Sequence, residues 1–141
     1  MINRRLILRA GLVGAATPVV LNAVPAAAAG VDPMVSGLAG SVFYTSEDPG
    51  RWAGKEGGHA PTFERSANNI EITTGHPMDG FVHYIVKHVL LDENLNYVAE
   101  VMFDPEKDSP VSQHNVAGLE GTVYALSMCN KHDLWLSALK L

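Results

Sequence analysis

The stretch LEGTVYALSMCNKHDLWLSALKL (Leu119–Leu141) contains two apolar runs separated by a short polar turn. The runs, 119–128 and 134–141, are rich in β-branched, aromatic and aliphatic residues, which favour strands. The turn between them carries Cys129, the only cysteine of the chain, three residues before His132. We therefore expect two strands that deliver a Cys-x-x-His turn to one end of a β-structure.

Working outward from this stretch, the rest of the chain shows the same strand-and-turn pattern. Further strand candidates are 41–45, 70–74, 81–92 and 97–103, and the Gly-, Pro- and polar-rich segments 36–61 and 104–118 read mostly as loops. No segment has a convincing helical periodicity. Five or six short strands with turns between them predict an all-β fold, a β-sandwich.

The first 29 residues have the pattern of an export signal. A basic head with Arg4, Arg5 and Arg9 precedes an apolar Gly/Ala-rich stretch that closes on small residues near Ala29. The arginine pair followed by Leu6, Ile7 and Leu8 favours a twin-arginine signal, with an ordinary secretory signal or an uncleaved membrane anchor as alternatives. All three predict a location outside the cytoplasm, the periplasm for the first. Residues 30–141 are then the folded domain.

Charge narrows the range of partners. The whole chain has a formal net charge of −5. Loss of residues 1–29 removes three arginines and no acid, which leaves seven Lys and Arg against 15 Asp and Glu, or about −8. A domain this acidic argues against nucleic acid and anionic membrane surfaces as partners.

The single cysteine and several of the six histidines suit a metal site. An exported protein that has one thiol cannot form an internal disulfide, and metal binding protects a thiolate from oxidation. Gly/Pro-marked loops hold or border His59, His76 and His83, whereas His88 lies mid-strand and His114 in a polar loop, and we expect neither of the last two to be a ligand. Four imidazoles and one thiolate suit a redox metal with one open position, either iron or copper.

Three blocks of the sequence resemble one family. YALSMCNKHDLW resembles the Cys-Asn-x-His-Gly-Leu-Trp signature of superoxide reductases, which include the neelaredoxins and the iron domain of desulfoferrodoxin. HPMDGFVHYI is similar to the family's His-Pro-Met…His-Tyr-Ile segment, and RWAGKEGGHAP to its Trp…Glu-Lys-His-Val-Pro segment. The blocks occur in family order from Trp52 to Trp135.

The resemblance implies an immunoglobulin-like β-sandwich that reduces superoxide to hydrogen peroxide. It also implies one mononuclear iron per chain, re-reduced by an external donor such as a rubredoxin-like or other small redox protein, and a homodimer or homotetramer. The implied iron ligands are four equatorial imidazoles and one axial thiolate, namely His59, His76, His83, His132 and Cys129.

The chain departs from the family pattern beside the iron. The family's Glu-Lys pair is Gly57-Gly58 here, and Lys55 and Glu56 stand two residues further from the histidine. We take Lys55 or Lys131 as a replacement for the family lysine that attracts superoxide, and Glu56 as a replacement for the family glutamate. The alternative is that these are ordinary solvated side chains on the surface. Asp133 stands where the family has glycine.

Three other functions remain open at this point. The first is an iron-binding electron-transfer or redox-sensing module without efficient turnover, which the missing Glu-Lys pair favours. The second is a cupredoxin-like copper carrier, although no methionine follows His132 to serve as the weak axial ligand. The third is a structural β-sandwich without a metal.

Overall fold

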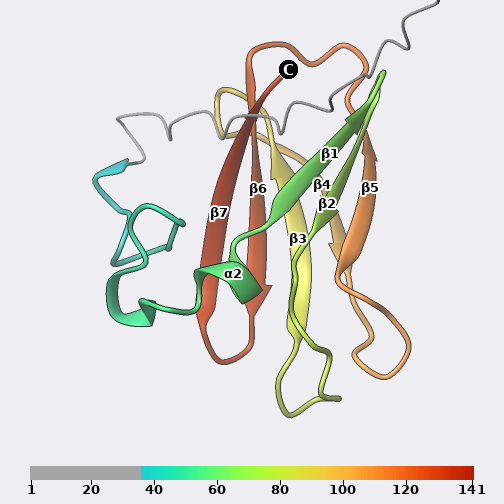
Figure 1. Cartoon of the computed structure of the whole chain (residues 1–141). Coiled ribbons are helices and arrows are strands. Elements are labelled where there is room, and N and C mark those ends of the chain that lie inside the picture. The colour runs from blue at the N-terminus through green and yellow to red at the C-terminus, as the bar shows by residue number, and fades with distance from the viewer. Residues whose placement is uncertain (1–35) are drawn as a thin grey trace, which may run out of the picture.

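The computed structural model describes residues 36–141. The predicted signal segment and the predicted domain start at residue 30 lie outside the described residues. Seven strands form two antiparallel sheets, a three-stranded one in the order β1-β2-β5 and a four-stranded one in the order β4-β3-β6-β7 (Figure 1). The strands are β1 (Thr62–Ser66), β2 (Asn69–Thr73), β3 (Ile85–Leu91), β4 (Tyr97–Met102), β5 (Val111–Asn115), β6 (Thr122–Cys129) and β7 (Asp133–Lys140).

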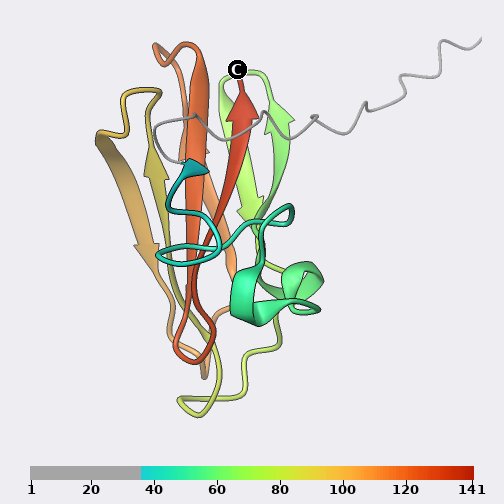
Figure 2. The same ribbon diagram turned by 90° about the vertical axis from the view of Figure 1, so that its left-hand side faces the viewer.

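The two sheets pack face to face, as Figure 2 shows from the side. The predicted β-sandwich is therefore confirmed. The hairpin that opened the sequence analysis lies in the larger sheet, where β6 and β7 pair from Thr122↔Lys140 to Cys129↔Asp133. The pairing ends at the Cys-x-x-His turn, as expected. No helix among the described residues is long and apolar enough to cross a membrane.

Several element predictions were wrong. The expected strand 41–45 forms only isolated bridges, in which Phe43 pairs with Ala39 and Tyr44 with Trp135 on β7. The expected loop 104–118 contains β5, and β1 together with the short helices η1 (Gly50–Trp52) and α2 (Glu56–His59) went unrecognised. Both missed strands are polar in sequence, because β1 is an exposed edge strand and β5 directs Ser112 and His114 inward.

An apolar core fills one part of the space between the sheets. It consists of Ile70, Ile72, Leu90, Val116, Val123, Ala125 and Leu139. Alternation along the strands explains its composition, since side chains two residues apart share a face of a sheet. Ile70 and Ile72 on β2 are fully buried, as is Leu90 on β3. These side chains hold the sheets together through the hydrophobic effect.

A second group of inward side chains is polar, and we call it the polar layer. It consists of Thr74, His88, Ser112, His114 and Ser127, all of them buried. Hydrogen bonds of 2.8–2.9 Å join them in one chain, Ser127–Thr74–His88–Ser112–His114. Since the Thr74 hydroxyl donates to Ser127 Oγ, a neutral His88 with its proton on Nε2 satisfies the whole chain. The polar layer therefore satisfies its buried polar groups internally.

Candidate metal centre

Three segments bring the predicted metal ligands to one end of the sandwich. Helix α2, the connection from β2 to β3 and the turn between β6 and β7 all lie at the lower end in Figure 1. Helix α2 carries His59, the connection carries His76 and His83, the last residue of β6 is Cys129, and the turn after it carries His132. Residues separated by more than 70 positions in the sequence therefore meet at one place.

The five predicted ligands form one compact group, which we call the metal group. It consists of His59, His76, His83, Cys129 and His132, and one ligand atom from each lies within 4.8 Å of the others. No other such group of three or more His, Cys, Asp or Glu residues occurs within 36–141. His88 and His114 lie outside it, in the polar layer.

Four imidazole nitrogens form a ring. His132 Nδ1 lies 3.0 Å from His59 Nε2 and 3.0 Å from His83 Nε2, and His83 Nε2 lies 3.0 Å from His76 Nε2. With metal–nitrogen bonds of about 2.1 Å, adjacent corners of a square are about 3.0 Å apart and corners of a tetrahedron about 3.4 Å apart. The three edges therefore fit a square of four nitrogens around one ion.

Cys129 Sγ lies over this ring. It is 3.6 Å from His132 Nδ1 and 4.0 Å from His76 Nε2, which are opposite corners. In the plane of the ring, an atom at these distances would overlap with His59 Nε2 or His83 Nε2, so the sulfur lies to one side of that plane. Its separation of at most 4.8 Å from each ligand nitrogen keeps it over the ring. The sulfur is buried and accepts a hydrogen bond from the backbone N–H of Lys131 at 3.5 Å. The arrangement suits four equatorial nitrogens and one axial sulfur.

Two backbone carbonyls set the tautomers of the buried imidazoles. His59 Nδ1 donates to the carbonyl oxygen of Lys55 at 2.8 Å, and His76 Nδ1 donates to that of Pro77. A carbonyl can only accept, so each Nδ1 carries the proton and each Nε2 keeps a free lone pair. Such hydrogen bonds orient metal-binding histidines and fix the ligating nitrogen.

Burial keeps these imidazoles neutral. It lowers the pKa of His59 to about 4, and the neighbouring His76 and His132 act in the same direction. Burial is also the main cause of the lowered pKa of His76, His83 and His132. Since a metal binds the neutral imidazole, the group is ready to bind a cation at neutral pH.

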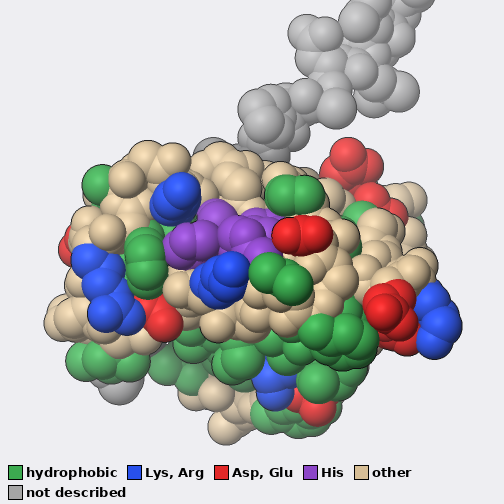
Figure 3. Space-filling model, turned by 90° about the horizontal axis from the view of Figure 1, so that it is seen from below, with side chains coloured by type: hydrophobic (Ala, Val, Ile, Leu, Met, Phe, Trp, Pro, Cys, Tyr) green, Lys and Arg blue, Asp and Glu red, His purple; other side chains and the backbone are tan. Residues whose placement is uncertain are grey.

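One side of the metal group reaches the surface. His59 and His76 are buried, whereas His83 and His132 are partly exposed. Figure 3 shows the histidines in the middle of this end of the molecule, with Lys or Arg side chains on two sides. Lys55 and Lys131 are both exposed, and the charge of each lowers the pKa of His83 and His132. Both lysines therefore contribute positive potential at the group.

Glu56 points back along its own segment. Its Oε1 accepts a hydrogen bond of 2.9 Å from the backbone N–H of Gly54, which is the main cause of its lowered pKa. Its carboxylate is not part of the metal group. In this conformation Glu56 organises the turn before α2, and its predicted role beside the metal stays a prediction.

Two residues that the sequence analysis did not assign to the site contact it closely. The Trp52 ring packs edge-on against the His132 ring, with centroids 4.7 Å apart. The Trp135 indole donates a hydrogen bond of 2.8 Å to the His132 carbonyl oxygen and packs 5.6 Å from His59. Both tryptophans lie in the blocks that resemble the family, which was the available signal.

Comparison with known proteins gives a consistent result. The desulfoferrodoxin family model matches residues 51–138, which is more than half of the chain and spans the whole metal group. No curated protein sequence matches the chain.

Solved structures share the fold. A superoxide reductase (neelaredoxin) from Ignicoccus hospitalis, variant E23A, superposes with a TM-score of 0.64 at 22% identity, covering 72% of this chain and 94% of that one. The one-iron superoxide reductase from Giardia intestinalis gives 0.52 at 22%, covering 61% and 100%. A hypothetical protein from Pyrococcus horikoshii gives 0.51 at 28%, covering 62% and 92%. By the extent of the family match, this chain belongs to the desulfoferrodoxin family.

Proposed function

We propose that this chain is a superoxide reductase, which converts superoxide, one electron and two protons into hydrogen peroxide at a single iron. The metal group carries the proposal, because four neutral imidazoles in a square and one thiol on one side of it are the ligands that residues 36–141 offer, which would leave the opposite side open to a small molecule. Family membership and the superoxide reductases among the structural neighbours support it. Bound iron would supply the one-electron couple that the reaction needs.

The chain's own residues hold and tune this site. His59, His76 and His83 offer Nε2, and His132 offers Nδ1. Cys129 loses its proton on binding and offers a soft, electron-donating sulfur. The N–H of Lys131 moderates that donation by its hydrogen bond to Sγ.

Replacement of the axial sulfur tests this ligand set. In Cys129→Ser, a hard hydroxyl replaces the soft thiolate, so the visible absorption of the ferric thiolate is lost. We expect the rate with superoxide to fall on the order of a hundredfold or more, since changes beyond the ligands already cost about 10–100-fold. Visible spectroscopy of the iron-loaded protein measures the first effect. An unchanged band would exclude Cys129 as a ligand.

Lys55 and Lys131 would attract the substrate. Superoxide is an anion and the protein is acidic, so local positive potential must guide it to the iron. We expect the double variant Lys55→Met/Lys131→Met to react about tenfold more slowly at low salt and to lose most of its salt dependence. Lys140→Met, at the far end of β7, is the control. A rate and salt dependence equal to those of the wild type would reject this role.

The remaining parts of the proposal concern the cellular setting. The electron donor is a small rubredoxin-like or other redox protein, which would approach the exposed side at His83 and His132. The protein is exported to the periplasm by the twin-arginine signal in residues 1–29 and forms a homodimer or homotetramer. Native mass spectrometry and fractionation of cells test these points.

Pulse radiolysis of the reduced, iron-loaded protein is the decisive experiment. We expect one iron oxidised per superoxide consumed, with one hydrogen peroxide released. A slow or absent reaction at a fully loaded site would favour the second candidate, an iron-binding electron-transfer or sensing module. The position of Glu56, turned back to Gly54, is the observation that favours this alternative. A copper carrier has less support, because such sites use two histidines and this ring holds four.

A further inference from the structure

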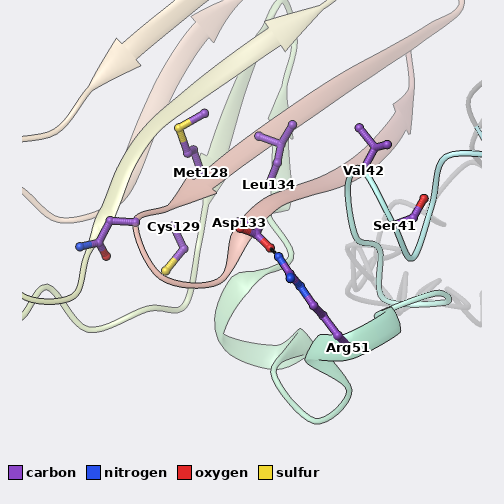
Figure 4. Close-up of a pocket in the computed structure, with 8 residues that line it drawn as sticks. Ser41, Val42, Arg51, Met128, Cys129, Asp133 and Leu134 are labelled. Carbon is purple, nitrogen blue, oxygen red and sulfur yellow. Dashed lines mark hydrogen bonds and ion pairs between the residues drawn. The ribbon is translucent and has the colours of Figure 1, made fainter.

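Asp133 joins two segments that are distant in sequence. Its Oδ2 accepts hydrogen bonds from the Arg51 guanidinium and, at 2.9 Å, from the Trp52 indole N–H. Figure 4 shows the Arg51–Asp133 ion pair extending from η1 to the turn that carries Cys129. One carboxylate therefore ties η1 to the β6–β7 turn, and we call this contact the Asp133 clamp.

The backbone at Asp133 makes this side chain unusual. Its φ of 62° lies in the left-handed region, which glycine adopts at no cost and which costs other residues free energy, least of all Asn and Asp. Glycine at this position would relieve the backbone and lose the clamp. The two effects can thus be separated by substitution.

The clamp reaches His132 directly. Trp52, which donates to Asp133, places its ring edge-on against the His132 imidazole at 4.7 Å and 87°. The His132 backbone is held separately, by the Trp135 indole on its carbonyl oxygen. Trp52 therefore restrains the ring of His132, while Trp135 restrains its main chain.

The clamp also reaches His59, through the segment that follows η1. The backbone N–H of Lys55 donates to the Trp52 carbonyl oxygen at 2.9 Å. The Lys55 carbonyl oxygen in turn accepts from His59 Nδ1 at 2.8 Å. Three hydrogen bonds, linked by the covalent structure of Trp52 and Lys55, thus connect Asp133 to His59.

We propose that Asp133 is a positioning residue of the metal centre, which holds His59 and His132 at the separation that one ion requires. Asp133 is not part of the metal group, and it acts through Trp52 and Arg51. The inference rests on the proposed function for the identity of the ion as iron.

The Asp133 clamp is not expected to act mainly by stabilising the fold. The side chains of Arg51 and Asp133 are 65% and 40% exposed, and exposed ion pairs contribute little to folding. The effect of the clamp is instead expected at the ligands, because residues beyond the ligands typically change metal affinity or activity 10–100-fold. The Lys87–Glu100 pair between β3 and β4 provides a matched control, being a partly exposed ion pair whose two residues are not part of the metal group.

The test compares Asp133→Gly, Asp133→Asn and Glu100→Gln in the iron-loaded full chain. The rate of iron loss to an excess of chelator is measured, together with the electron paramagnetic resonance spectrum of the ferric protein and the thermal midpoint. We expect Asp133→Gly to lose iron about tenfold faster or more and to broaden the spectrum, with a midpoint close to that of the wild type. Asp133→Asn keeps an acceptor for Trp52, so its rate of iron loss should lie between those of Asp133→Gly and the wild type. Glu100→Gln should match the wild type.

Unchanged iron loss and an unchanged spectrum in Asp133→Gly would overturn the proposal, as would an equal effect of Glu100→Gln. Should Asp133→Gly not fold, Trp52→Phe decides, since it keeps the ring against His132 and removes only the N–H that Asp133 accepts. If Trp52→Phe and Asp133→Asn both lost iron as slowly as the wild type, the clamp would then be rejected. A wild-type protein that holds iron but does not reduce superoxide would contradict the proposed function alone, because iron loss is measured without turnover.

Discussion

Along one face of β6, Val123 and Ala125 belong to the apolar core, Ser127 to the polar layer and Cys129 to the metal group. The chain shows the same order along β2 and beyond it. Ile70 and Ile72 lie on the strand, and Thr74 and then His76 follow its end. Each strand therefore changes from apolar to polar to metal-binding as it approaches the site.

The apolar core and the polar layer differ in the forces that hold them and in what they support. The apolar core is held by non-directional burial, which tolerates small shifts of its side chains. The polar layer is held by directional hydrogen bonds and lies directly behind the ligands, with the Thr74 carbonyl oxygen accepting from the His76 N–H at 2.7 Å. Substitutions in the apolar core should change mainly stability, and those in the polar layer both stability and site.

The largest effect is expected in the apolar core. Leu90→Ala removes a fully buried side chain and leaves a cavity, which should lower the free energy of unfolding by about 3–4 kcal/mol. The visible spectrum of the iron-loaded protein should not change, because Leu90 does not contact the metal group. Denaturant unfolding measures the first quantity. A spectrum altered by Leu90→Ala would break the proposed division between the two regions.

The polar layer should make stability depend on pH. Burial lowers the pKa of His88 to about 4, with His114 adding to the effect, so that between pH 6.5 and pH 4 the unfolded chain binds a proton that the folded chain does not. Stability from this group is complete above pH 6.5 and falls as the pH falls towards 4, by about 3 kcal/mol in all.

His88→Gln, which does not titrate, isolates this contribution. Denaturant unfolding of the metal-free protein at pH 7 and pH 4.5 should show a loss about 2–3 kcal/mol smaller in the variant than in the wild type. The comparison of slopes cancels the other histidines, His59 included. Equal losses in the two proteins would mean that His88 takes up its proton as readily in the folded protein as in the unfolded chain, and would reject this prediction.

A smaller effect is expected from one hydroxyl of the polar layer. Thr74→Val keeps the shape but removes the hydrogen bonds to His88 and Ser127, at a cost of about 2 kcal/mol for buried groups left without a partner. It should also raise the rate of iron loss a few-fold through His76. Thr73→Val, the neighbouring substitution on the opposite face of β2, is the control. Equal results from the two variants would remove the distinction between the regions.

Much of the fold followed from local pattern. The hairpins of β3 with β4 and of β6 with β7 combine β-branched and aromatic residues with clear turns, so their strands were predicted within a few residues. β5 was missed because its inward residues, Ser112 and His114, are polar. They bond to each other, and Ser112 also bonds His88 on β3 of the opposite sheet. Nothing within VSQHN indicates that partner on β3.

The sequence by itself determined which side chains can bind the metal, since the lone Cys129, the step to His132 and the loop histidines are local features. Only the tertiary structure decided how they meet. The square of nitrogens, the polar layer behind it and the Asp133 clamp each join segments that are distant in the sequence, and the sulfur of Cys129 lies over the square that they form. The physical reason is that these distances depend on how the sheets pack, whereas the donor atoms depend only on residue type.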